Sequence, residues 1–299
     1  MFIFLTVNQK GGKSMKSSGL KKTFTLILFT ILASSVPAQT LELQQLPSDK
    51  VLFGLNIDKP FFHNNYNYST WTATYRLFLN APISKKINLL LNVPYIKTNY
   101  TYSYTDNYFH TTNNYNSDQK GFGNIFLGIQ TNGTVVENKR SVYTFGVYLP
   151  SASKTATYWS IYSDYYYLPY YIPNSVGLYF NYSYHRTNVE GINYGLEFGP
   201  DFFIPTQQGV GAQLLLHYGI TAGYSFDKLL LSAEFHGRFA VSGFIISFDD
   251  RFVNLIGLGA QWKGDFITPK VFYKIFLKKD ISDMVSGVLG AGISFAIDK

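Results

Sequence analysis

Hydrophobic and polar residues alternate along most of the chain after residue 40. A period of two predicts β-strands, because successive side chains of a strand point to opposite faces. Polar and glycine-containing segments separate the alternating runs and predict turns. We place twelve strands, at 51–58, 70–81, 87–96, 121–131, 140–149, 174–185, 191–202, 211–225, 228–240, 252–262, 266–278 and 286–297.

The two faces of these strands differ in chemistry. One face is apolar, as in Leu214, Leu216, Tyr218 and Ile220, and it carries no charged residue in any of the twelve strands. The other face carries the charged side chains. They are Arg76, Arg140, His185, Glu197, His217, Glu234, His236, Arg238, Lys270, Lys274 and Lys278. This pattern is typical of transmembrane barrels, in which a lysine or arginine facing lipid costs ~2–4 kcal/mol at the midplane.

A soluble sandwich also alternates, but it turns its apolar face inward and coats its outside with charge. Only 14% of the residues are charged, against about 25% in soluble domains. That is too few to coat a soluble exterior of this size. The sequence therefore predicts an all-β fold, a transmembrane antiparallel up-and-down β-barrel of about 12 strands.

The connections between the predicted strands alternate between long and short. The longest are 97–120 and 150–173, and the connections that alternate with the long ones have only two to eight residues. Long outer loops and short periplasmic turns are typical of an outer-membrane barrel. The N-terminus then lies in the periplasm, and Tyr184, Tyr224, Trp262 and Phe295 form an aromatic girdle at that side. We predict localisation in the bacterial outer membrane.

The first forty residues resemble a secretory signal. Lys16, Lys21 and Lys22 precede an apolar run at 24–32, and small residues at Val36 and Ala38 follow. The alternatives are a core helix or a membrane anchor, but the run is shorter than the about 20 residues that a spanning helix needs. We predict a signal peptide at 1–38 with its true start at Met15. A periplasmic segment follows at 39–50 and the barrel at 51–299.

Net charge and cysteine content exclude several functions. Without the five lysines of the first 38 residues, 20 Lys and Arg face 18 Asp and Glu. The folded part has too little excess positive charge for a nucleic-acid-binding face. The absence of cysteine excludes disulfides, thiolate metal sites and a cysteine nucleophile.

Charged residues on three consecutive predicted strands should meet inside the barrel. They are Glu197, His217, Glu234, His236 and Arg238. Two interpretations stay open: a paired network that fills a narrow barrel, or a polar lining that selects what passes. Arg76, His185, Lys270 and Lys274 complete the predicted lumen set. The lysines either favour anions or are offset by the acids opposite.

The long loops are built from Tyr, Asn, Thr and Ser. Either they form a hydrogen-bonding surface, or one folds inward and lines an entrance with aromatic rings. The predicted ligand contacts in the second case are Tyr158, Trp159, Tyr166 and Tyr170.

Catalysis has weak support in the sequence. His217, Ser232 and Glu234 are the only grouping that could form a Ser-His-acid relay, and the set points inward. We assign no catalytic residue, no metal ligand and no cofactor. His217 and His236 could share a metal, but histidines in a charged network are more often hydrogen-bonding partners.

Three motifs carry a family resemblance: Leu-Asn-Val-Pro-Tyr at 91–95, Gly-Phe-Gly-Asn-Ile-Phe-Leu-Gly at 121–128 and Phe-Gly-Val-Tyr-Leu-Pro-Ser at 145–151. The chain resembles the outer-membrane family named for the meta-pathway of phenol degradation. Asn124 stands where that family has Asp, and Ser151-Ala152 where it has Thr-Gly. The resemblance implies passage of small, often aromatic or apolar, compounds.

We expect a passive channel for small, aromatic or hydrophobic molecules. The alternatives are a closed structural barrel with ligand-binding loops and, third, a lipid-modifying enzyme. The expected partners are outer-membrane lipid, a small-molecule solute and the barrel-assembly machinery, which would recognise the C-terminal strand at 286–297.

Overall fold

The computed structural model describes residues 48–63, 68–106, 111–136, 138–154, 157, 165–207, 211–242 and 249–297. The predicted signal peptide and most of the segment at 39–50 lie outside these residues and stay predictions.

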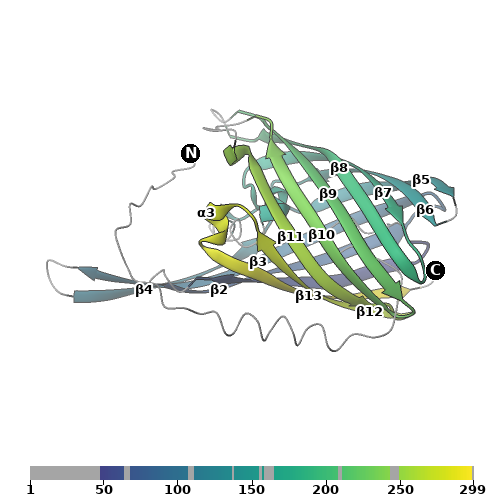
Figure 1. Ribbon diagram of the computed structural model, residues 1–299. Coiled ribbons are helices and arrows are strands. Elements are labelled where there is room, and N and C mark those ends of the chain that lie inside the picture. Colours follow the sequence, from purple (N-terminus) through teal and green to yellow (C-terminus); the bar gives the residue numbers. More distant parts are fainter. Residues whose placement is uncertain are drawn as a thin grey trace. The chain divides into compact units, whose positions relative to one another are not determined.

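Within these described residues, thirteen antiparallel strands make up the fold (Figure 1). They are β1 (Val51–Phe62), β2 (Tyr68–Pro82), β3 (Ile87–Asp106), β4 (Thr111–Phe122), β5 (Phe126–Val136), β6 (Lys139–Tyr148), β7 (Ser175–Arg186), β8 (Gly191–Pro205), β9 (Gln213–Phe226), β10 (Leu229–Ala240), β11 (Phe252–Trp262), β12 (Ile267–Phe276) and β13 (Val285–Ile297).

Twelve of these strands form a closed ring. Each pairs with its neighbour in the order of the chain, except that β3 is followed by β5, and β13 returns to pair with β1 from Val51↔Ile297 onward. Closure leaves no free sheet edge within the ring, which is what allows a β-structure to span hydrocarbon. The predicted twelve-stranded antiparallel barrel is confirmed.

The strand β4 lies outside this ring. It pairs with the second half of β3, from Tyr95↔Phe122 to Asp106↔Thr111, whereas the first half of β3 pairs with β5. The predictions of a loop at 97–120 and of one strand at 121–131 were therefore wrong. The alternation is hard to recognise there because 97–120 consists mainly of Tyr, Asn, Thr and Ser and has no apolar face.

The two faces of the barrel wall have the predicted chemistry. Ile220, Leu77 and Phe145 point outward and are 62%, 56% and 54% exposed. Between them in the alternation, polar side chains such as Thr74 and Thr144 are completely buried. The apolar face is thus the outer surface and the polar face lines the interior.

The two rims of the barrel differ in their connections. Short turns at 83–86, 187–190, 227–228 and 263–266 share one rim with the end of β5, the start of β6, the start of β1 and the end of β13. We call this the terminal rim. The opposite loop rim carries the longer connections, which include the 3-10 helices η1 (Tyr165–Tyr171) and η2 (Asp249–Arg251) and the α-helix α3 (Lys279–Ser282). None of the helices in the described residues could cross a membrane.

Aromatic rings gather on the outer surface near the terminal rim. Tyr184 lies near Tyr194 with ring centroids 6.4 Å apart, and Phe53 stacks on Phe295 at 5.2 Å. Trp262, the last residue of β11, is 48% exposed on the outer surface at the same rim. Such a belt is what an interface between lipid headgroups and hydrocarbon selects.

The outward position Ile220 lies in the middle of β9 and tests which face meets lipid. We expect Ile220→Arg to lower the free energy of unfolding of the barrel in bilayers by about 2–4 kcal/mol, because the charge would sit in hydrocarbon. Chemical unfolding of the barrel in lipid vesicles measures this. The control Ile220→Ala should cost clearly less, and equal losses in the two variants would contradict the assignment of this face.

Candidate functional site

The barrel interior holds a chain of polar contacts centred on Asp201 of β8. Arg238 of β10 donates to the Asp201 carboxylate, and His217 Nδ1 lies 3.2 Å from it. His217 Nε2 lies 3.1 Å from the side-chain oxygen of Asn181, whose amide donates to Glu197 at 3.2 Å. We call these five residues the Asp201 network. It crosses four neighbouring strands, β7 to β10.

Two further contacts extend this wall of the interior. His236 Nε2 lies 2.7 Å from the Glu234 carboxylate, to which Thr221 also donates at 3.4 Å. The ring of His217 stacks on Tyr179 with centroids 4.9 Å apart and planes 8° apart. The stack fixes the plane of the imidazole and leaves its two nitrogens for Asp201 and Asn181.

A second network lies on the other side of the ring. Asp58 of β1 accepts from Arg76 of β2 at 2.5 Å and lies 3.2 Å from Lys274 Nζ of β12. Lys274 and Lys270 both approach the ring of Phe272, at 5.1 Å and 5.4 Å from its centroid. Because β1 and β8 are six places apart in the ring of twelve, this Asp58 network faces the Asp201 network.

Amide side chains line the interior toward the terminal rim. Asn88 donates to Asn80 at 2.7 Å, and Asn80 approaches Gln130 at 3.5 Å.

In the turn at 263–266, burial lowers the pKa of Lys263 to about 7. The cause is desolvation, which disfavours the charged ammonium.

These interior side chains are closely packed. Asp58 and Asp201 are 0% exposed, Lys274 is 1% and Arg238 is 5%. Buried charges are tolerated only when they are paired and hydrogen-bonded. Asp58 contacts two cations, and Asp201 contacts one cation and a histidine. The interior at this level is therefore filled by side chains and leaves no wide aqueous pore.

The structure places the predicted lumen residues as follows. Arg76, His185, Glu197, His217, Glu234, His236, Arg238 and Lys274 are buried inside, and Lys270 is half-buried. Sequence reasoning missed Asp58, which pairs with Arg76 and Lys274, and Asp201, which pairs with His217 and Arg238. Both keep the alternation of their strands, and Asp201 follows Glu197 at an even spacing, so the pattern contained the signal. The role of this set in transport stays a prediction.

The three lysines on the charged face of the predicted strand at 266–278 have different surroundings. Lys274 is paired with Asp58, whereas Lys278 lies beyond the end of β12 and contacts Asp250 at 3.0 Å. The predicted strand at 266–278 is shorter because α3 follows at Lys279. Lys278 thus belongs to the loop rim and not to the interior wall.

Residues 168–172 of the connection between β6 and β7 fold into the barrel. Tyr170 and Tyr171 are 5% and 0% exposed, and the Tyr171 hydroxyl donates to the interior side chain of Thr74 at 3.3 Å. The ring of Tyr170 packs edge-on against Tyr148 at 5.3 Å. Their buried neighbours come from five strands. They are Leu90, Ile96, Phe126, Tyr148, Phe203 and Leu215.

This arrangement agrees with the inward-folding alternative for the loop at 150–173. Of the predicted ligand contacts, Tyr170 is buried in the aromatic cluster. The backbone of Tyr166 belongs to η1, but its side chain lies outside the described residues, as do Tyr158 and Trp159.

Asn124 holds this loop in place. Its side-chain amide donates to the carbonyls of Pro169 at 2.9 Å and Ile172 at 2.7 Å, and its side-chain oxygen accepts from the backbone N–H of Ala152 at 3.0 Å. Its own backbone N–H donates to Tyr170 at 2.7 Å. Asn124 lies in the break between β4 and β5, so the break positions these four hydrogen bonds. We call them the Asn124 clasp.

The Ser-His-acid relay of His217, Ser232 and Glu234 is not assembled in the part of the chain that the structure describes. His217 contacts Asp201 and Asn181, and Glu234 contacts His236 and Thr221. Neither contacts Ser232. Among the same residues, no group of three or more His, Asp or Glu side chains is placed to hold a metal ion.

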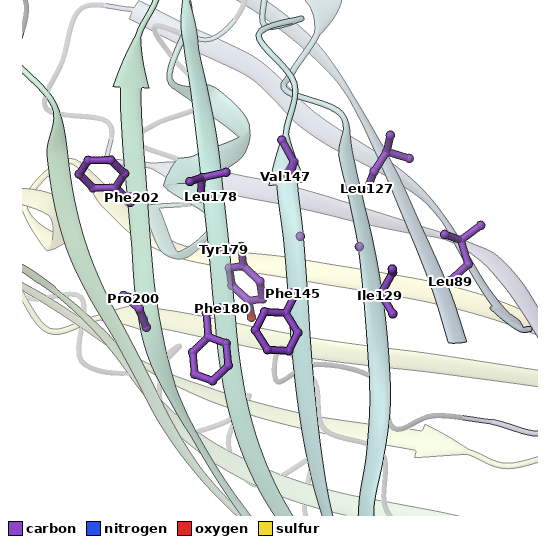
Figure 2. Close-up of a pocket in the computed structure, with 12 residues that line it drawn as sticks. Leu89, Leu127, Ile129, Phe145, Val147, Leu178, Tyr179, Phe180, Pro200 and Phe202 are labelled. Carbon is purple, nitrogen blue, oxygen red and sulfur yellow. The ribbon is translucent and has the colours of Figure 1, made fainter. Parts of the chain in front are cut away.

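The outer wall carries an apolar groove of about 660 Å³ over β3 and β5 to β8, shown in Figure 2. Leu127, Phe145 and Leu178 are among its lining residues, and Gly128 pairs directly with Gly146 beneath them. On the inner side, a Cβ atom at Gly128 would lie 2.8 Å from the ring of Phe126. The glycines therefore leave room on the inner side for the ring of Phe126, which covers both of them.

The class of protein follows from this fold and this interior. The chain is a transmembrane β-barrel of the outer-membrane class. No protein-family model matches it, and no curated protein matches it.

Solved structures do match. An outer membrane channel from Pseudomonas putida F1 is similar at a TM-score of 0.60 and 10% identity, over 87% of this chain and 100% of that chain. The translocator domain of the autotransporter NalP from Neisseria meningitidis has a TM-score of 0.47 and 11% identity, over 85% and 90%. The NanC porin has 0.46 and 8%, over 81% and 98%. At such low identity, the first likeness shows the fold alone.

The buried pairing at Asp201 leads to a stability prediction. Asp201→Asn should cost about 3–5 kcal/mol of unfolding free energy, because it leaves the buried Arg238 without its carboxylate. Chemical unfolding of the refolded barrel measures the loss. The double variant Asp201→Asn with Arg238→Met should recover part of it, since no unpaired charge remains. A double variant as unstable as the sum of the two single variants would contradict the pairing.

Proposed function

We propose that the protein is a passive channel that carries small, aromatic or hydrophobic molecules across the bacterial outer membrane. The observation that carries the proposal is a barrel interior that combines polar side chains along its length with an aromatic cluster beneath the loop rim. The fold shared with an outer membrane channel supports the proposal.

The aromatic cluster favours apolar solutes. Tyr148, Tyr170, Tyr171, Phe126 and Phe203 gather where the β6–β7 loop enters the interior. Such rings offer flat apolar surface together with hydroxyl groups, which suits weak and reversible contact with aromatic compounds. A passive channel needs contacts of this kind, because a solute that binds tightly does not leave.

The family resemblance supports the same function. Its motif at 121–128 contains Asn124, which forms the clasp of the β6–β7 loop. Its motif at 145–151 ends at Ser151, which donates to the carbonyl of Gly123 at 2.9 Å. The substitution of the family's Asp by Asn124 suits this chain, because only an amide can donate to the carbonyls of Pro169 and Ile172. We propose membership of the family on this basis.

We further propose that the terminal rim faces the periplasm. The short turns and the chain termini share that rim, as in outer-membrane barrels generally. The loop rim, with the β3–β4 hairpin and the β6–β7 connection, then faces the cell exterior.

The second candidate function is a closed barrel whose loops bind a ligand. The complete burial of Asp58 and Asp201 favours it, since fully paired interior charges can serve packing alone. Conduction in turn requires the β6–β7 loop to move away from the interior.

Single-channel recording in planar bilayers separates the two functions. We expect ohmic conductance steps from the folded protein, with small unitary size because the interior is narrow. A folded protein that stays silent would reject an aqueous path. It would favour a closed barrel or lateral passage of apolar compounds through the wall at the groove in Figure 2.

Asn124→Asp should raise the open probability of the channel. The carboxylate cannot donate to the carbonyls of Pro169 and Ile172 and places negative charge beside them, so the loop loses its attachment. The removal of two buried hydrogen bonds predicts about a tenfold or greater shift of the loop equilibrium. The same recording measures it.

Asn138→Asp serves as the matched control. This exposed residue at the terminal rim contacts Asn188 at 3.0 Å and no part of the β6–β7 loop. The open probability of the Asn138→Asp channel should equal that of the wild type. An Asn124→Asp channel that gates like the control would show that the clasp does not limit conduction.

A further inference from the structure

Three lysines point outward from the barrel near the loop rim. Lys59, Lys97 and Lys120 lie on β1, β3 and β4, beyond the ends of the strands predicted from the sequence. Lys97 and Lys120 are exposed, and Lys59 is half-buried with its amine donating to the Thr72 carbonyl of β2 at 3.2 Å. They lie at the edge of the apolar outer face that is nearer the loop rim.

Strand register places these lysines in one row. Lys97 pairs with Ala73 on one side and directly with Lys120 on the other. The β1–β2 register ends at Asp58↔Thr74, so its next step brings Lys59 opposite Ala73. Neighbouring strands are about 4.8 Å apart, so the row spans roughly 15 Å across four strands.

A row of aromatic side chains lies directly below the lysines, one outward position closer to the middle of the barrel. Ile57 pairs with Tyr75, Tyr75 with Tyr95, and Tyr95 with Phe122. The rings of Tyr75 and Tyr95 are 6.4 Å apart, and those of Tyr95 and Phe122 are 5.5 Å apart. Aromatic rings occupy the boundary between hydrocarbon and headgroups, which puts the lysine row at the height of the headgroups.

The pairing of Lys97 with Lys120 is unfavourable without an anion. Like charges directly opposite each other on neighbouring strands destabilise a sheet. Within the described residues, neither lysine forms an ion pair with a protein carboxylate. The nearest acid in the register, Asp118, lies opposite Asn99, one outward position farther from the apolar band.

We propose that Lys59, Lys97 and Lys120 bind the headgroup phosphates of lipopolysaccharide in the outer leaflet. Lysine binds phosphate as a point charge, and basic clusters at a membrane surface select anionic headgroups. The acyl chains would lie against the aromatic row and the apolar wall beneath it. The inference rests on the proposed orientation, which puts the loop rim outside, but not on conduction.

Native mass spectrometry of the protein purified from the outer membrane of a Gram-negative host tests the site. The probes are lipid A carrying both phosphates, lipid A without phosphate, and phosphatidylglycerol. We expect the wild type to bind the phosphorylated lipid A most tightly. Lys97→Gln with Lys120→Gln should weaken that binding about fivefold for each lysine removed. Binding of the dephosphorylated lipid should not change.

The control variant replaces Lys85 and Lys86 by Gln in the exposed turn at 83–86 of the terminal rim. It should bind phosphorylated lipid A like the wild type. Equal affinities of the Lys97/Lys120 variant and the wild type would overturn the site. A variant that loses only phosphatidylglycerol would overturn the lipopolysaccharide assignment and the orientation. Channel recordings of the same variants report separately on the proposed function.

Discussion

Pairing between the first and last strands is the constraint on which the structure depends. The register from Val51↔Ile297 to Phe62↔Val285 joins β1 to β13 and turns an open sheet into a ring. In hydrocarbon an unpaired backbone group costs several kcal/mol, so an open edge would exclude the sheet from a membrane. Closure also divides all side chains into an outer and an inner set, which makes the strict alternation of the sequence necessary.

The narrow interior explains why its charges are arranged in shared pairs. Twelve strands enclose Asp58 with Arg76 and Lys274 on one side, and Asp201 with Arg238 and His217 on the other. A charge in such a space must find a partner across strands, because water has little access. The same packing that stabilises the barrel therefore restricts what can pass through it.

Loop and wall act together at the loop rim. The break between β4 and β5 at Asn124 does more than interrupt a strand, because it positions an amide that holds the β6–β7 connection inside the barrel. The β3–β4 hairpin, in turn, carries Lys97 and Lys120 outward over an aromatic row. One short region of the chain thus shapes both the interior and the lipid-facing surface of this rim.

The sequence by itself determined the fold class, the faces of the strands and the alternation of short and long connections, because a period of two and a lipid environment leave few other solutions. It also indicated that Glu197, His217, Glu234, His236 and Arg238 share the interior. Only the tertiary structure decided that Asp201 joins His217 and Arg238, that Asp58 joins Arg76 and Lys274 on the opposite wall, that β4 stands outside the ring and that η1 folds inward. Those features depend on register between strands and on contacts between segments far apart in the chain, neither of which periodicity contains.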